Sequence, residues 1–411
     1  MKSVAFVTTA FPTTAMFVEA DVRRLHERGV RVQVFALRSP RGREWQDEHD
    51  GLLPLTRWVG SPAHPAAWGA LLGWLIRKPH VLLPAWTRML WASRKSAYAL
   101  AGHLAYLPAA ARIASQVERE GLEQVHAAWA HFPGSVAFLV ARLTGRPFSM
   151  SAHAGSDLYR TQAFLAEKAR AARFTATCVS RNADMLRALA GPDARVECVY
   201  HGVDLGRFDG SERARDPEPL LVTVGRLVPA KGFDLAVEAL GMLPSESRAR
   251  LVVVGEGPER ARLESLARAA GVESRVTFTG PLPQRELVGL YRRAWMLLAP
   301  SRVLANGRRD GIPNVTIEAM AMGVPVLGTA AGGLEEAITS GETGVLVPPN
   351  DARALSEALT RELADPAGLE RMGDQARRLV KDRFDAARNF ERLFDLLDGE
   401  AAVAVAEERS A

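Results

Sequence analysis

The strongest constraint on the fold is a regular alternation of short apolar runs and helical segments in the second half of the chain. Six strand-like runs are separated by helical segments of roughly 10–15 residues. The runs are LLVTVG, RLVVVG, RVTFTG, WMLLAPS, PVLGT and GVLVP. Runs this apolar indicate strands buried on both faces, as in a parallel sheet covered by helices. The pattern therefore predicts a Rossmann-like domain.

The first half shows the same alternation, interrupted by one long helical stretch. Its strand-like runs are SVAFVTTA, VRVQVFAL, QVHAAW, PFSMSAH, FTATCVS and VECVY. Between the second and the third of these, residues 52–120 are predicted to form several helices rich in Trp, Leu and Ala. A chain of 411 residues exceeds the roughly 250–300 residues over which a single core keeps growing, so we expect two domains.

A polar segment near the middle of the chain predicts the domain boundary. Residues 209–219, DGSERARDPEP, are rich in charge and Pro and have no apolar period. We therefore predict an N-terminal Rossmann-like domain over residues 1–208, which includes the Trp-rich helices, and a C-terminal one over residues 209–385. Residues 386–411 are predicted to form a last helix and a tail that can pack back on the N-terminal domain.

Charge is unevenly distributed along the chain. Residues 1–208 hold 26 Lys and Arg against 16 Asp and Glu, although the whole chain has a net charge of only +5. A basic first half favours an anionic partner, which can be a membrane surface, a nucleic acid or an acidic sugar. The two cysteines, Cys178 and Cys198, lie in strand-like runs and are interpreted as small core residues, which fits a reducing cytoplasm.

Two further patterns bear on the membrane. The N-terminal residues have the pattern of a strand and are too short and polar for a signal peptide, and no apolar run approaches the ~18 residues of a spanning helix. We therefore expect a protein that is neither secreted nor integral to a membrane.

Candidate binding residues follow the predicted strands of the second half, at the edge where parallel strands place ligands. Gly225 and Arg226 follow the first of these strands, and Lys231 comes five residues after Arg226. Such cations are often solvated surface residues, but beside a glycine loop at a strand end they favour a diphosphate. Gly255 and Gly257 follow the next strand, in a turn where a planar base can lie against backbone. A plain strand-to-helix turn explains these two glycines equally well.

A second group of candidates lies between Arg309 and Gly333. This segment carries Asp310, a Gly-x-Pro turn, a helix that opens near Asn314, and Glu318, eight residues after Asp310. Such a loop offers free backbone N–H groups and the positive end of a helix dipole to an anion. The two acids can bracket a polar ligand. We interpret the segment as the clamp for the sugar and the ribose of a nucleotide-sugar.

The order of these pieces resembles family 4 of the retaining glycosyltransferases, and most of all its bacterial polysaccharide-assembly members. The matching segments are GRLVPAKG, VVGEGPER, FTGPLP, LLAPS, DGIPNVTIEAMAMGVPV and GGLEEAI, and more loosely HAAWAHFPG, SAHAGSDLY, CVSRNADML and YHGVDLGRF in the first half. The resemblance implies the GT-B fold, in which two Rossmann-like α/β domains face each other across a cleft. Asp310 and Glu318 match the E-x7-E signature of the family with Asp in place of the first Glu, which can change the sugar hydroxyls that this acid reaches.

The resemblance also implies a role for each matching residue. Arg226 and Lys231 would hold the donor diphosphate, Glu318 the ribose hydroxyls, and Asp310 with the following loop amides the donor sugar. The implied donor-binding set is Gly225, Arg226, Lys231, Gly255, Gly257, Leu282, Gly311, Ile312, Pro313, Asn314, Val315 and Glu318. The implied catalytic set is His153, Asp310, Arg226 and Lys231.

The first half supplies fewer candidates. His153 follows a predicted strand and is expected to point into the cleft and line the donor sugar site, although a single His is usually structural. His131 is an acceptor-side candidate, and His126 is a structural or acceptor-side one. Thr13 and Thr14 lie in a loop where many relatives carry a Gly pair that touches the phosphate, so an acceptor role is the alternative for them.

These features together predict an enzyme that moves a hexosyl group, with retention, from a UDP- or GDP-sugar to a hydroxyl of a lipid-linked saccharide. The chain has no D-x-D sequence and no His/Cys cluster at ligand spacing, so we expect no metal. We also expect no cofactor and no nucleic-acid partner. The cations would stabilise the leaving diphosphate. The alternatives are a GT-B phosphorylase, an epimerase, or a non-catalytic protein that binds nucleotide-sugars.

A stretch without acidic residues favours a membrane surface as the anionic partner. No Asp or Glu occurs from Gly51 to Val117, whereas seven Lys and Arg and five of the eight tryptophans do. They are Arg57, Arg77, Lys78, Arg88, Arg94, Lys95 and Arg112, and Trp58, Trp68, Trp74, Trp86 and Trp91. Trp rings favour headgroup depth, and each cation near anionic lipid contributes about 1 kcal/mol. We expect peripheral binding at the cytoplasmic face of the plasma membrane, unless these apolar side chains fill the domain's own core.

Overall fold

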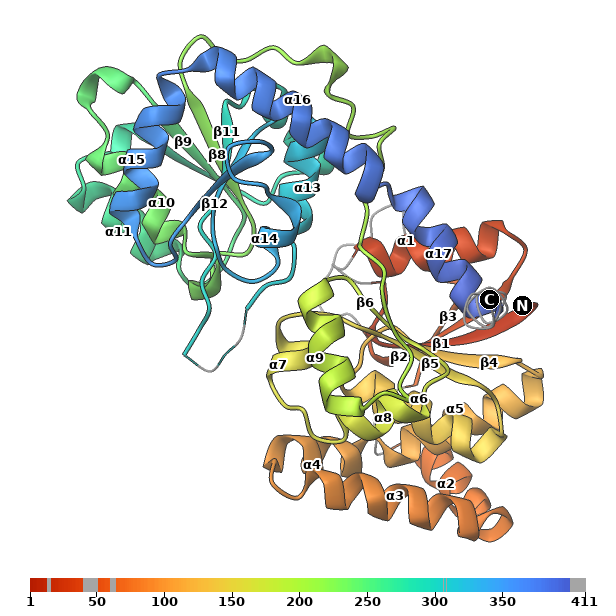
Figure 1. Cartoon of the computed structure of the whole chain (residues 1–411). Helices are drawn as coiled ribbons and strands as arrows, with labels where there is room; N and C mark the ends of the chain where they lie inside the picture. The colour runs from red at the N-terminus through yellow and green to blue at the C-terminus, as the bar shows by residue number, and fades with distance from the viewer. Residues whose placement is uncertain (13–15, 40–50, 60–63, 306, 308, 400–411) are drawn as a thin grey trace. The chain divides into compact units, whose positions relative to one another are not determined.

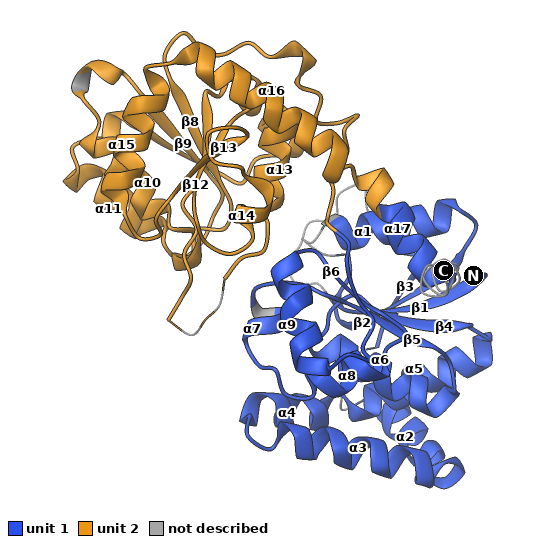
Figure 2. Ribbon diagram, viewed as in Figure 1, with its two compact units in different colours: residues 1–199, 390–411 blue, residues 200–389 orange. Residues whose placement is uncertain are grey.

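The computed structural model describes residues 1–12, 16–39, 51–59, 64–305, 307 and 309–399. The chain divides into two compact units (Figure 2): residues 1–199 with 390–411 form unit 1, and residues 200–389 form unit 2. Unit 2 therefore begins nine residues before the predicted start at 209. The reason is that Val203 donates its N–H to the Phe384 carbonyl and that Phe208 packs in the core of unit 2.

Unit 1 contains a parallel sheet of seven strands in the order β3-β2-β1-β4-β5-β6-β7 (Figure 1). The strands are β1 (Ser3–Ala10), β2 (Arg31–Arg38), β3 (Thr56–Trp58), β4 (Gln124–Ala127), β5 (Phe148–Ala152), β6 (Thr175–Thr177) and β7 (Val196–Cys198). The prediction of helices alone over residues 52–120 is wrong at β3, where Thr56 pairs with Val34 of β2. Three residues at a sheet edge are too few to show a period of two.

The helices of unit 1 cover both faces of this sheet or pack on the helices that do. They are α1 (Met16–Glu27), α2 (Pro65–Arg77), α3 (Pro79–Ser93), α4 (Ala97–Ala105), α5 (Leu107–Glu120), α6 (Phe132–Thr144), α7 (Ser156–Tyr159), α8 (Leu165–Ala171), α9 (Ser180–Ala190) and α17 (Ala386–Asp398). Apolar side chains of α1 and α17 share one core with β1 and β2, and those of α5 and α6 fill a second core. The helices α2 and α3 pack on α5 and α6, so they form an outer layer of unit 1 (Figure 1).

Unit 2 contains a parallel sheet of six strands in the order β10-β9-β8-β11-β12-β13. The strands are β8 (Leu220–Val224), β9 (Arg250–Val254), β10 (Val276–Gly280), β11 (Met296–Ala299), β12 (Val326–Thr329) and β13 (Gly344–Val347), which confirms all six strands predicted from the alternation. The helices are α10 (Phe233–Met242), α11 (Arg260–Ala269), α12 (Gln284–Arg293), α13 (Asn314–Ala321), α14 (Leu334–Ala337), α15 (Ala352–Leu363) and α16 (Pro366–Arg383). Two apolar clusters form the core of this unit.

Two features follow directly from local sequence. Asp351 caps α15, because its carboxylate accepts the N–H of Ala354 at 2.8 Å, as the Asn-Asp pair before the helix predicts. Among the described residues, none of the helices is long and apolar enough to cross a bilayer.

Candidate functional site

The loops that follow β8 and β9 in unit 2 approach each other backbone to backbone. Gly225 donates its N–H to the Val254 carbonyl, and Gly255 donates to the Gly280 carbonyl, both at 2.9 Å. A Cβ on Gly255 would lie 2.0 Å from the Gly225 oxygen, and Gly255 has a φ of +131°. Only glycine fits at this contact.

Gly257 has a similar role one turn further on. A Cβ at this position would lie 2.4 Å from the Leu227 oxygen. Leu227 in turn donates its N–H to the Glu256 carbonyl at 3.0 Å. The two glycines of this turn therefore position the loop that carries Arg226, whereas a plain strand-to-helix turn would accept a larger residue. Their contact with a base stays a prediction.

The two predicted phosphate-binding cations lie on this loop. The side chain of Arg226 is exposed and makes no ion pair with another side chain in the part of the chain that the structure describes. Lys231 ends a short 3₁₀ turn, Pro229–Lys231, and its Nζ lies 2.8 Å from Oδ2 of Asp310. Gly232, with a φ of +64°, follows at a place where a Cβ would lie 2.0 Å from the Pro300 oxygen. The fold thus brings Lys231 into direct contact with the acid of the second predicted cluster.

The loop from Asp310 to Pro313 is held by the glycine pair after β12. A Cβ on Gly332 would lie 2.3 Å from the Asp310 oxygen, and one on Gly333 would lie 2.8 Å from the Gly311 carbonyl carbon. This loop leads into α13, and no side chain caps the helix at the preceding Pro313. The first N–H groups of α13, which begins with the predicted residues Asn314 and Val315, therefore suit an anion.

Glu318 lies one turn into α13, largely enclosed by the core of unit 2. Burial raises the pKa of its carboxyl to about 7, against a hydrogen bond from Tyr291 that lowers it. The hydroxyl of Tyr291 donates to Oε2 of Glu318 at 3.3 Å, and its ring is fully buried. A carboxylate held this way can accept two hydroxyl groups, as a ribose offers.

The other donor-side candidates surround these groups. Ile312 and Leu282, which follows β10, are partly buried and pack against the core of unit 2. They supply apolar surface beside the polar groups. In unit 2 the structure therefore gathers the predicted donor-binding residues in the loops at the carboxyl ends of β8, β9, β10 and β11.

The carboxylate of Asp157 organises the predicted residues of unit 1. Its Oδ1 accepts Nδ1–H of His131 at 2.6 Å and the backbone N–H of His131 at 2.9 Å. Its Oδ2 accepts the backbone N–H of His153 at 2.8 Å and that of Ala130 at 3.1 Å. Burial alone would raise the pKa of Asp157, but the hydrogen bonds from the His131 side chain and the His153 backbone lower it. Asp157 thus holds the loops after β4 and β5 together as an ionised group.

His153 is buried in unit 1, with 8% of the residue exposed. Its Nε2 donates to the Ala128 carbonyl at 3.0 Å, and its ring packs against Phe17 and Trp129. Burial lowers the pKa of His153, so the imidazole is neutral near pH 7. Its predicted place at the donor sugar stays a prediction.

The other two candidate histidines differ in exposure. His131 is partly exposed, with 21% of its side chain accessible, and stays an acceptor-side candidate. His126 is buried and contacts the Ser149 and Ser151 hydroxyls at 2.9 and 3.2 Å, which is a structural arrangement. Thr13 and Thr14 lie outside the described residues.

A hollow of about 360 Å³ lies beside Phe132, between the end of β2 and α4. The rings of Tyr98 and Tyr106 lie 5.1 and 5.4 Å from the Phe132 ring, and all three line the hollow. Arg38 also lines it, and its Nε donates to the Tyr106 hydroxyl at 2.9 Å.

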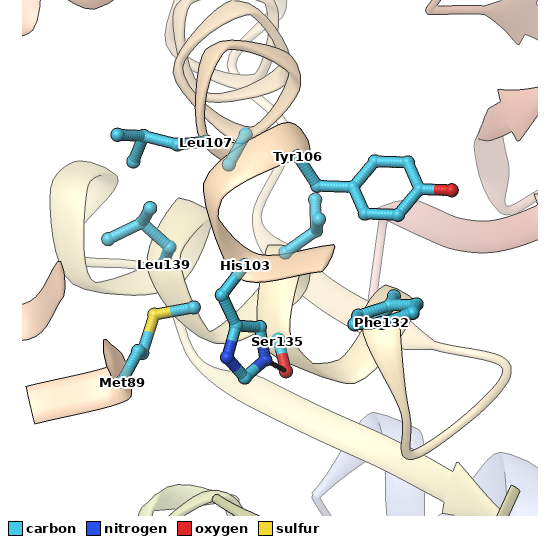
Figure 3. A pocket seen from close by; sticks show the side chains of 9 residues that line it. Met89, His103, Tyr106, Leu107, Phe132, Ser135 and Leu139 are labelled. Atoms are coloured by element: carbon cyan, nitrogen blue, oxygen red, sulfur yellow. Dashed lines mark hydrogen bonds between the residues drawn. The ribbon is translucent and has the colours of Figure 1, made fainter. Parts of the chain in front are cut away.

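Tyr106 and Phe132 also line a smaller buried pocket, where Nε2 of His103 is hydrogen-bonded to the Ser135 hydroxyl at 2.8 Å (Figure 3). Met89, Leu107 and Leu139 form its apolar wall (Figure 3). Burial lowers the pKa of His103 to about 3, so this ring stays neutral. The smaller pocket is a packing feature, whereas the hollow can receive a ligand with apolar faces.

Two Rossmann-like units with loops of this kind define the GT-B fold of the glycosyltransferases. The solved structure of HepE from Anabaena in complex with UDP has a TM-score of 0.72 to this chain at 16% identity, and covers 97% of this chain and 100% of that chain. The predicted fold class is therefore confirmed.

Sequence comparison matches part of the second half of the chain to one family model. Residues 207–379 match the family model described as "Glycosyl transferases group 1". A GDP-mannose-dependent alpha-(1-6)-phosphatidylinositol monomannoside mannosyltransferase of Mycolicibacterium smegmatis is 35% identical over 220 residues, which is 51% of this chain and 58% of that protein. WcaL of Escherichia coli, named for colanic acid biosynthesis, is 35% identical over 43% of this chain and 44% of its own length. The chain spans about half the length of the curated relatives it matches.

Sequence reasoning missed the residues that position the others. Tyr291, which holds Glu318, lies 27 residues away from it, and Asp157, which holds His131, lies 26 residues away. Neither residue stands in a local pattern with its partner. The one available sequence signal was Asp157 in SAHAGSDLY, five residues after the end of β5.

Proposed function

We propose that this protein is a retaining, family 4 glycosyltransferase that moves a sugar from a nucleotide-sugar to a hydroxyl of a lipid-linked saccharide. The observation that carries the proposal is the arrangement of Arg226, Lys231, Asp310 and Glu318 at one edge of the sheet in unit 2. Two cations and an uncapped helix N-terminus suit a diphosphate, and two acids suit the hydroxyls of a sugar and a ribose. One nucleotide-sugar offers all of these groups.

The comparisons support a UDP- or GDP-sugar as the donor. HepE is described in complex with UDP, and the mycobacterial relative is named a GDP-mannose-dependent enzyme. The same relative acts, by its name, on a phosphatidylinositol mannoside, which is a glycolipid. A lipid-linked acceptor and a role in bacterial polysaccharide or glycolipid assembly are therefore part of the proposal.

The proposed reaction proceeds on one face of the donor sugar. The acceptor oxygen forms a bond to the anomeric carbon on the face from which the diphosphate leaves. The bond between that carbon and the leaving phosphate oxygen breaks, and its electron pair stays on the nucleoside diphosphate. The leaving oxygen takes the proton of the acceptor hydroxyl, so atoms and charge balance.

Charge on the leaving group is stabilised by Arg226, by Lys231 and by the N-terminus of α13. The ion pair between Lys231 and Asp310 orients both side chains, with 21% and 29% of them exposed. A partly exposed pair of this kind is weak, at about 1 kcal/mol or less, so Lys231 can turn to a diphosphate at little cost. Asp310 then has an oxygen to offer to the donor sugar.

On the acceptor side, the hollow lined by Phe132 suits a saccharide. Aromatic rings such as Tyr98 and Phe132 present flat apolar faces, and a sugar ring has apolar C–H faces that pack on them. Arg38 adds a cation for an anionic group on the acceptor.

The proposal is tested first by ligand binding and then by turnover. UDP, GDP, ADP and their sugars are screened for an increase in Tm, since a ligand of the native state raises apparent stability. The donor that binds is then incubated with saccharide acceptors, and NMR of the product shows the anomeric configuration. Transfer with retention supports the proposal, whereas inversion contradicts the mechanism.

The same assay separates the alternatives. A phosphorylase requires inorganic phosphate and releases a sugar phosphate, and an epimerase isomerises the donor without an acceptor. Binding of a nucleotide-sugar without turnover on any of these substrates would identify a non-catalytic protein and overturn the proposal.

Metal removal tests the charge stabilisation by Arg226 and Lys231. We expect excess EDTA to leave the rate within about twofold of the untreated enzyme, because protein cations replace a metal at the diphosphate. Initial rates with and without EDTA provide the measurement. A complete loss of activity that magnesium restores would show that the transfer depends on a metal.

A further inference from the structure

The outward side of α2 carries a stripe of large apolar side chains. Trp68, Leu72 and Ile76 are spaced by four residues, so they project from one side of the helix, and they are 55%, 59% and 74% exposed. The opposite side of α2 is buried, where Trp74 donates its indole N–H to the Ala111 carbonyl at 3.0 Å. The helix therefore has apolar side chains on both sides, although one side suffices to hold it in place.

The next helix also exposes large apolar side chains. In α3, Leu83 and Trp91 are 42% and 68% exposed, whereas Leu82 and Met89 are buried. We use the name outer face for Trp68, Leu72, Ile76, Leu83 and Trp91 together with the cations Arg88 and Lys95. Apolar side chains exposed together to this extent are rare on a monomer that faces only water.

Six of the seven cations of this region fall into two groups. Arg77 and Lys78 lie 3.0 and 3.7 Å from the Glu118 carboxylate, and Arg57 pairs with Glu120. Two carboxylates offset most of the charge of these three cations within unit 1, so the three contribute less to an external surface.

The second group of cations is Arg88, Arg94 and Lys95. Arg88 and Lys95 are exposed and form no ion pair with another side chain in the described ranges. The guanidinium of Arg94 lies 4.1 Å from the centre of the Trp91 ring. A cation over an exposed Trp is an arrangement that places charge and ring at the same depth.

We propose that the outer face docks on an anionic lipid bilayer, with Trp68, Leu72, Ile76, Leu83 and Trp91 inserted at headgroup depth. The charge of the region favours an anionic bilayer as the partner, because no Asp or Glu occurs from Gly51 to Val117. Trp on each helix, with Leu and Ile between, is the composition of an interfacial surface. The inference does not depend on the transfer reaction, but it would bring the hollow in the same unit close to a lipid-linked acceptor.

Vesicle flotation tests this docking with the full chain. Vesicles of phosphatidylcholine with phosphatidylglycerol, and of phosphatidylcholine alone, are the probes. The wild-type protein should float with the anionic vesicles at low salt, and binding should weaken as salt is added. The double variant Trp68→Gln, Ile76→Gln should bind at least about tenfold less.

Matched variants separate docking from general effects. Met242→Gln removes a side chain of the same 55% exposure from unit 2 and should leave binding unchanged. Arg88→Glu with Lys95→Glu should weaken binding to anionic vesicles, whereas Arg378→Glu with Lys381→Glu makes the same change of net charge on α16 and should not. Circular dichroism and Tm confirm that each variant is folded.

Three results would overturn the inference. The first is wild-type protein that stays unbound with anionic vesicles at low salt. The second is equal binding by the outer-face variants and by their controls. The third is self-association of the wild-type chain that Trp68→Gln, Ile76→Gln abolishes without any vesicle binding, which would make a second copy of the chain the partner.

Discussion

The Glu318 carboxyl has the clearest pH dependence in the candidate site. Because burial raises its pKa to about 7, the group is neutral below that pH and ionised above it. Only the ionised carboxylate accepts hydrogen bonds from both ribose hydroxyls with both of its oxygens, because the neutral carboxyl carries a proton and donates a hydrogen bond. We therefore expect nucleotide affinity to rise as the pH increases through about 7, by several-fold. Titration calorimetry of the binding nucleotide on both sides of this pH measures the change, with Glu318→Gln as the variant that loses it.

The same shift predicts the opposite trend in stability. Between the ordinary value of 4.5 and about 7, native Glu318 keeps a proton that the unfolded chain releases. The contribution of Glu318 to stability is therefore present below pH 4.5 and is lost as the pH rises through about 7. Glu318→Gln should remove this loss. A variant with an unchanged pH profile of both affinity and stability would refute the role of this carboxyl.

Arg226 and Lys231 are predicted to act on the leaving group. Lys231→Ala and Arg226→Ala should each raise the barrier by roughly 2–4 kcal/mol, which lowers kcat by about 30- to 1000-fold. Steady-state kinetics with the identified donor measure this. Arg353→Ala, an exposed cation on α15, is the control. Rates within twofold of wild type for both Arg226 and Lys231 variants would remove these residues from the mechanism.

At the scale of secondary-structure elements, backbone contacts between loops position the site. The strand ends of β8, β9 and β10 are linked through Gly225, Gly255 and Gly280, and the glycine pair after β12 presses on the loop before α13. Binding groups that follow separate strands are held in one place, because glycine at the contact positions lets the backbones of these loops touch.

Gly255→Ala tests this backbone contact. The new Cβ would lie 2.0 Å from the Gly225 oxygen, so the loops must move apart, and we expect a loss of about 2–4 kcal/mol of stability together with weaker nucleotide binding. Gly271→Ala is the control, because this glycine has a φ of +69° with no atom near its Cβ position. It should cost only about 1 kcal/mol. Equal Tm values for the two variants would contradict the contact argument.

At the scale of the whole molecule, the last helix ties the end of the chain to unit 1. The chain leaves unit 1 after residue 199 and returns with α17, whose Phe390, Leu393 and Leu396 are buried with side chains of α1, β1 and β2. Unit 1 therefore completes its core only after unit 2 has been synthesised.

Leu393→Asp tests this dependence. A buried aspartate without a partner should destabilise unit 1 by more than about 3 kcal/mol. Calorimetry of the full chain should show the transition of unit 1 at a lower temperature. Nucleotide should still raise the Tm of the transition of unit 2. Arg388→Asp, an exposed position in the first turns of α17, is the control. A normal thermogram for Leu393→Asp would show that α17 is dispensable.

Local sequence determined much of this protein. The six strands of unit 2, the glycine loops after them, and the candidates Arg226, Lys231, Asp310 and Glu318 follow from spacing along the chain, because strand periods, turns and helix starts depend on neighbouring residues. The order of these pieces resembles family 4 of the retaining glycosyltransferases, and that resemblance implies the GT-B class.

Tertiary structure alone decided the rest. It set the pairing of Lys231 with Asp310, the support of Glu318 by Tyr291, and which tryptophans face outward. Trp68 and Trp74 have the same local composition around them, yet one is 55% exposed and the other 1%. The difference arises because burial depends on which side of α2 meets α5, and that contact joins segments that are distant in sequence.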